Sequence, residues 1–139
     1  MTVKEVKKLF QSLERLDSEA QVTCERTHEL RSKMIYKPVE IASRKARGGD
    51  YTAKAIAELD IEEKRAGEKL YNYITLYRQL QDLIEQLESP AEREVMNRRY
   101  ILYQGYGEIA EKMHYTERTI YIIHGQALKN ISLNFSKKL

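Results

Sequence analysis

Residues 89–131 contain closely spaced helix start and stop signals, and these constrain the fold more than any other feature of the chain. The sequence Ser-Pro-Ala-Glu at residues 89–92 supplies a capping serine, a proline at the first helical position and a glutamate that can return the capping hydrogen bond. A Gln-Gly pair at residues 104–105 interrupts the helical pattern, and residues 106–113 follow as a second, short helix. After a tight turn, Thr116 is predicted to cap a third helix.

The third helix is predicted to be amphipathic. Its apolar residues recur at steps of three and four, at Ile120, Ile123, Ala127, Leu128 and Ile131. In the second helix, Ala110 supplies the small residue that a steep crossing of two helices needs. A polar face is left over, comprising Glu117, Arg118, Tyr121, Gln126 and Lys129. Such a pair of helices is typical of a helix-turn-helix, so double-stranded DNA is the leading candidate partner.

The predicted DNA contacts divide into two groups. Arg118 and Tyr121 lie near the start of the third helix and are predicted to meet base edges in the major groove, and Glu117 beside them is a further candidate for contact with DNA. The predicted contacts to the phosphate backbone come from Thr116, Thr119, Gln126 and Lys129, and from Arg98 and Arg99 in the preceding helix. A solvated surface role is the alternative for each of these side chains.

These residues resemble region four of bacterial sigma factors. The matching positions are Glu92-Arg93-Glu94, Arg99-Tyr100, Glu108-Ile109-Ala110-Glu111, Thr116, Ile120, Ile123 and Ala127-Leu128-Lys129. With its long helical N-terminal part, the whole chain is similar to the small sigma-like regulators of Gram-positive phages, in the ArpU and RinA groups of late-gene activators. The resemblance implies a phage or prophage regulator of transcription that either contacts RNA polymerase as a sigma-like factor or binds upstream as an activator.

The third helix departs from the sigma pattern at two places. Glu117 precedes Arg118, whereas the family usually has an arginine followed by a glutamate, and Ile122 stands where a polar base-reading residue is common. A consensus promoter element is therefore not expected as the target. His114 occupies a turn position where glycine is frequent, although histidine is among the residues enriched at positive φ.

Residues 1–88 are predicted to form a long antiparallel helical hairpin, which makes the chain all-α. The apolar positions of residues 3–36 fit one helical face, interrupted by Thr23 and Thr27. Lys37-Pro38 is expected to end this helix. The basic segment of residues 43–50 is expected to be a mobile loop, either adding DNA contacts or keeping the turn soluble.

The second long helix is expected over residues 52–88. Its heptad positions are Ile56, Glu63, Leu70, Tyr77 and Ile84, alternating with Leu59, Ala66, Tyr73, Leu80 and Leu87. Ile74, Leu76 and Leu83 widen the apolar stripe beyond the width that one partner helix would cover. This surplus motivates two alternatives, a homodimer through the long helices or docking of the C-terminal domain, which is expected over residues 89–139.

Composition indicates where in the cell the chain is expected and which partners its charge favours. No long apolar run or signal-peptide core is visible in the 139 residues, so neither a membrane span nor secretion is expected. The single Cys24 fits a reducing cytoplasm, and the predicted location is the nucleoid of a bacterial host cell. All of the formal net charge of +3 belongs to residues 90–139, where eight Lys and Arg face five acids. That excess agrees with attraction to phosphate.

The sequence indicates neither catalysis nor a cofactor. It has no glycine-rich phosphate loop and no nucleophile elbow, and His28, His114 and His124 lack metal-ligand spacing. Glu92 and Glu94 are interpreted as helix-surface charges. The leading hypothesis is thus a sequence-specific DNA-binding regulator. The alternatives are a DNA-packaging adaptor, such as a small terminase subunit, and a helical module that binds only proteins.

Overall fold

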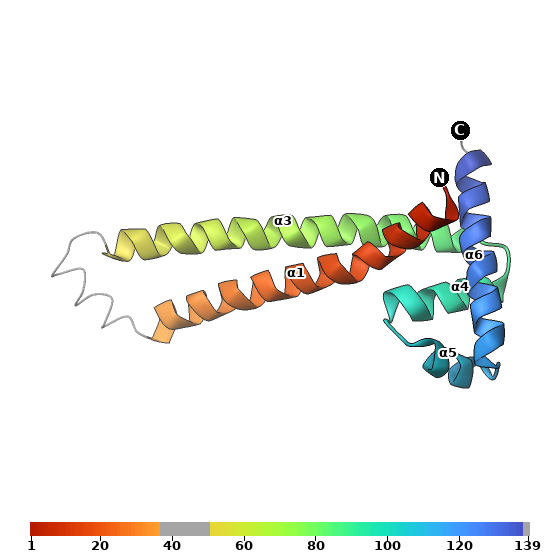
Figure 1. The fold of residues 1–139 in the computed structure, drawn as a ribbon. Coiled ribbons are helices and arrows are strands. Elements are labelled where there is room, and N and C mark those ends of the chain that lie inside the picture. Colours follow the sequence, from red (N-terminus) through yellow and green to blue (C-terminus); the bar gives the residue numbers. More distant parts are fainter. Residues whose placement is uncertain (37–50, 138–139) are drawn as a thin grey trace. The chain divides into compact units, whose positions relative to one another are not determined.

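The computed structural model describes residues 1–36 and 51–137, and all of its regular elements are helices (Figure 1). In chain order they are α1 (Val3–Tyr36), α3 (Tyr51–Glu85), α4 (Pro90–Met96), the π-helix η1 (Asn97–Ile101), α5 (Tyr106–Met113) and α6 (Glu117–Lys137). The predicted all-α class is confirmed, with an antiparallel pair of long helices followed by a compact group of short ones. The loop expected at residues 43–50 lies outside the described residues.

The chain divides into two compact units. The larger unit comprises Met1–Arg15 and Ile74–Leu139, and the smaller unit comprises Leu16–Tyr73. The short helices therefore share their unit with the first turns of α1 and the last turns of α3. Over residues 1–36 and 51–137, no helix combines the length and the apolar character needed to cross a membrane.

In the smaller unit, polar groups join the two long helices. The Thr27 hydroxyl, which is buried, lies 3.2 Å from the carbonyl oxygen of Glu62 on α3 and 2.9 Å from that of Thr23. The two threonines thus belong to the packed face of α1 instead of interrupting it, because backbone carbonyls satisfy their hydroxyls. Glu63, which breaks the predicted heptad, forms an ion pair with Arg31 of α1.

The predicted heptad seam is only partly correct in α3, since Leu59 and Ala66 are half-buried but two other predicted positions are exposed. Ile56 is 49% exposed and Leu70 is 43% exposed, whereas Ile84, assigned to the same set of positions, is fully buried. A straight α-helix turns by about 20° per heptad away from a strict seven-residue repeat, so a stripe that faces a partner at one end faces water further along. Leu76 and Leu83, part of the surplus apolar surface in the sequence, are buried.

The core of the larger unit draws side chains from every helix that enters it. Its fully buried large residues are Val6, Phe10, Leu13, Leu80, Ile84, Val95, Met96, Ile109, Ile120 and Ile131. Phe10 of α1 meets Tyr100 of η1 with ring centroids 5.1 Å apart, and Ser132 of α6 donates a hydrogen bond to the carbonyl oxygen of Met1. The start of the chain therefore packs directly against η1 and α6.

Candidate nucleic-acid interface

The turn between α5 and α6 is closed by the local signals expected from the sequence. His114 ends α5 in the left-handed conformation, with φ 60° and ψ 39°, and Tyr115 N–H donates to the carbonyl oxygen of Ala110 at 3.0 Å. Thr116 caps α6, since its hydroxyl oxygen accepts a hydrogen bond from Thr119 N–H at 3.2 Å. The two threonine hydroxyls also lie 2.8 Å apart, so both candidate phosphate contacts take part in the cap.

A small apolar cluster fixes α6 against α4 and α5. Val95, Ile109, Ala110 and Ile120 are buried in it, and Tyr106, Met113 and Ile123 pack against its edge. The small residue expected at the helix crossing, Ala110, is 6% exposed. The inner face predicted for α6 is therefore correct, and burial of that face determines which side chains of α6 point outward.

The outward face of α6 presents the predicted contact residues of this helix together with Ile122, which the sequence places at a base-reading position, and Gly125, which was not predicted. The exposed residues of α6 between positions 117 and 129 are Glu117, Arg118, Tyr121, Gln126 and Lys129, joined by Ile122 and Gly125. Arg118, Ile122, Gly125 and Lys129 follow one another at steps of four, three and four, which places them on a single stripe. This spacing from Arg118 is the signal that could have identified Gly125 in the sequence.

Behind this face, three side chains from three elements stack on one another. The guanidinium carbon of Arg99 lies 4.5 Å from the centre of the Tyr106 ring, and Arg99 also donates to the carbonyl oxygen of Gln104 at 3.1 Å. The Tyr106 ring in turn meets that of Tyr121, with centroids 4.4 Å apart. Tyr106 was not among the residues predicted from the sequence to belong to the site. Its contacts support the exposed Tyr121 from below, with Arg99 as the last member of the stack.

Arg98, the other arginine predicted to contact the phosphate backbone of DNA, is half-buried and forms an ion pair within the chain. Its Nε donates to Glu94 at 2.7 Å, an i,i+4 ion pair, and a terminal nitrogen lies 3.4 Å from the side-chain oxygen of Gln104. Both arginines belong to η1, where Leu102 N–H donates to the carbonyl oxygen of Asn97, five residues back. A π-bulge of this kind often marks functional sites in α-helices.

Beneath the stack lies a buried polar pair that apolar periodicity does not reveal. The Tyr100 hydroxyl is 2.6 Å from Nε2 of His124, which is only 6% exposed. Burial, with smaller contributions from the cations Lys7 and Arg99, lowers the pKa of His124 to about 4, and burial also raises the pKa of Tyr100. The imidazole is therefore neutral near pH 7, and the tyrosine hydroxyl donates to it.

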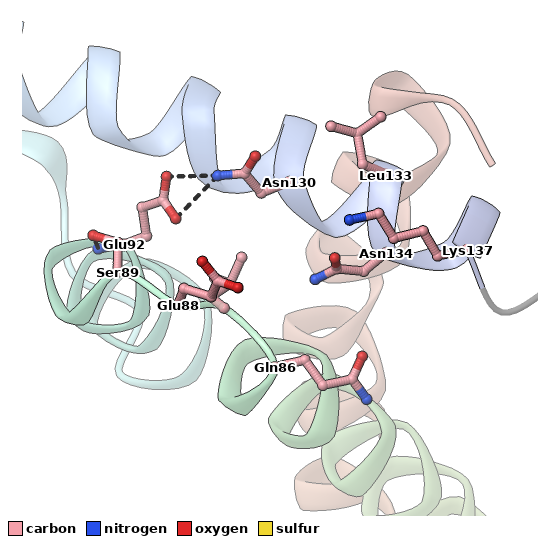
Figure 2. Close-up of a pocket in the computed structure, with 9 residues that line it drawn as sticks. Gln86, Glu88, Ser89, Glu92, Asn130, Leu133, Asn134 and Lys137 are labelled. Atoms are coloured by element: carbon pink, nitrogen blue, oxygen red, sulfur yellow. Dashed lines mark hydrogen bonds between the residues drawn. The ribbon is translucent and has the colours of Figure 1, made fainter.

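On another side of the larger unit, a cavity of about 290 Å³ is lined by the segment between α3 and α4, the start of α4 and the second half of α6 (Figure 2). There Asn130 donates its side-chain N–H groups to both carboxylate oxygens of Glu92, at 2.9 and 3.2 Å. The expected capping box is thus only half formed, since Ser89 Oγ accepts from Glu92 N–H but the carboxylate turns to Asn130. The assignment of Glu92 as a surface charge was wrong because this partner lets it be buried.

A metal centre finds no support in residues 1–36 and 51–137, where no group of three or more His, Cys, Asp or Glu side chains could hold an ion. Cys24 lies exposed on α1. The chain matches no protein-family model, and no curated protein and no solved structure matched it. The case for a function therefore rests on the residues of α5 and α6 themselves.

Proposed function

We propose that this chain binds double-stranded DNA in a sequence-specific manner through the outward face of α6 and thereby regulates transcription. The observation that supports this most is the exposed stripe from Arg118 to Lys129, which contains two cations and no carboxylate. It lies on a capped helix whose opposite face is fixed by a buried cluster. The resemblance of residues 89–131 to sigma region four supports the same role.

The proposed mode of binding follows from the dimensions of the helix and of DNA. An α-helix fits the major groove of B-form DNA, where each base pair presents a distinct pattern of donors, acceptors and methyl groups. Arg118, in the first turn of α6, would offer its guanidinium to the two acceptors of a guanine. Lys129 lies eleven residues later, about 16 Å along the axis, which suits a contact to the phosphate backbone at the edge of the groove.

Tyr121 has a different part in this mode of binding. Its ring is held from behind by Tyr106 and Arg99, so little rotational freedom would be lost when it meets a base edge. Arg99 is half-buried against the Tyr106 ring, so its proposed role is to support Tyr121 through Tyr106.

The test is binding of the full chain to fragments of the genome that encodes it, at near-physiological salt and with competitor DNA. Wild type is compared with Arg118→Ala and with Arg78→Ala, which removes an exposed arginine from α3. We expect a discrete bound fragment, weakened by about 1–3 kcal/mol by Arg118→Ala and unchanged by Arg78→Ala. Binding of wild type no stronger than to competitor DNA would refute the proposed function.

A further inference from the structure

Between residues 117 and 129, the outward face of α6 contains one large aliphatic side chain among its polar ones; a second exposed one, Leu133, follows further along the helix. Ile122 is 58% exposed and lies one turn after Arg118, near the middle of the exposed stripe. An exposed isoleucine contributes nothing to the core, which in α6 is built from Ile120, Ala127, Leu128 and Ile131. Its position on the face of α6 proposed to bind DNA makes it a candidate for contact with the DNA.

Gly125 adds a second, independent observation on the same stripe. A Cβ atom built on Gly125 would have no neighbour within 4 Å, so packing inside the chain does not require glycine there. Glycine inside a helix costs about 1 kcal/mol relative to alanine, and here no internal contact offsets that cost. A helix backbone without a side chain on the outward face allows a partner molecule to approach closely.

The charges along this stripe favour DNA as that partner, and the exposed carboxylate of Glu117 lies beside Arg118 at the start of the helix. The stripe has Arg118 on one side of Ile122 and Lys129 on the other, and the polar residues between them, Tyr121 and Gln126, are uncharged. An apolar side chain with one cation on each side of it suits DNA, a polyanion whose grooves also contain apolar groups. In the major groove that apolar group is the 5-methyl of thymine.

We propose, on the basis of the proposed function, that Ile122 contacts the 5-methyl group of a thymine in the bound DNA. Gly125 then permits the helix backbone to lie close to the groove at this point. Residues four apart on a helix are separated by about 6 Å along its axis, which corresponds to about two base pairs at 3.4 Å each. The thymine therefore lies within about two base pairs of the guanine assigned to Arg118.

The experiment removes one methyl group at a time from the DNA. In the bound fragment, each thymine of the protected site is replaced by deoxyuridine, which retains the base pair and lacks only the 5-methyl. Affinity is measured for wild type, for Ile122→Ala and for Leu102→Ala. Leu102 is the matched control because it is also 58% exposed and lies in the same unit but outside α6.

We expect deoxyuridine at one position to weaken wild-type binding by about fourfold, the effect of burying one methyl group. Ile122→Ala should weaken binding to the thymine fragment and lose its sensitivity to that deoxyuridine, whereas Leu102→Ala should keep the wild-type pattern. Selective binding that is equally strong with thymine and deoxyuridine at every position would overturn this inference alone. Failure of wild type to bind any fragment selectively would overturn the proposed function as well.

Discussion

Protonation of His124 should destabilise the folded chain as the pH falls below neutrality. The ring is buried, its Nε2 accepts a hydrogen bond from Tyr100 at 2.6 Å, and the cations Lys7 and Arg99 also oppose a positive charge on it. Its folded-state pKa is about 4, whereas an unfolded histidine titrates near 6.5. The unfolded chain therefore binds the proton first, so this contribution to stability is complete above about pH 6.5 and is lost as the pH falls toward 4.

The magnitude follows from the difference between the two pKa values of His124. One pKa unit corresponds to 1.36 kcal/mol, so a shift from 6.5 to about 4 amounts to about 3 kcal/mol over the full range. Between pH 7 and pH 5 the expected loss in the free energy of unfolding is about 2 kcal/mol. This is a large fraction of the stability of an ordinary small protein.

The assay is urea unfolding at pH 7 and pH 5, followed by circular dichroism. His124→Gln is the informative variant because glutamine can still accept the hydrogen bond from Tyr100 but does not titrate. His28→Gln is the control, since His28 lies exposed on α1. We expect wild type and His28→Gln to lose about 2 kcal/mol more than His124→Gln between the two pH values. An equal loss in all three proteins would refute the reasoning.

Three further changes test other parts of the larger unit. Asn130→Ala leaves the buried carboxylate of Glu92 without its donor and should cost about 1–3 kcal/mol in urea unfolding; an unchanged midpoint would mean that water replaces the amide. Gly125→Ala should raise the free energy of unfolding by about 1 kcal/mol while weakening DNA binding, and a loss of stability would contradict the open space around that position. Ile120→Ala should cost about 2–5 kcal/mol because the side chain is fully buried, whereas Ile122→Ala should leave thermal unfolding almost unchanged; equal effects would show that the two faces of α6 were assigned incorrectly.

The parts of the fold that could be predicted are those with local causes. The cap at Thr116, the left-handed His114 and the alternation of inner and outer faces along α6 each depend on residues within one or two helical turns. Hydrogen bonds and side-chain spacing at that range are properties of the sequence itself.

The features that could not be predicted depend on partners far away in the chain. His124 falls on the apolar face of α6, four residues after Ile120, but the sequence does not show that its partner there is the hydroxyl of Tyr100. Glu92 likewise has a distant partner, since its donor Asn130 comes from another helix. Part of the heptad seam of α3 was missed because a small angular drift per heptad becomes large only over several heptads.

The larger unit is assembled from Met1–Arg15 and Ile74–Leu139, with the residues of the smaller unit between them in sequence. The contact between Phe10 and Tyr100 therefore closes a very long loop during folding. The entropy of closing a loop grows only slowly with its length, but contacts between distant residues slow the search for the native state. Early pairing of α1 with α3 would shorten that search because it brings the two segments of the larger unit close together. The long hairpin should therefore speed the folding of the short helices and act as a guide for them. A fragment that starts at Ser89 would lack both Phe10 and this guide.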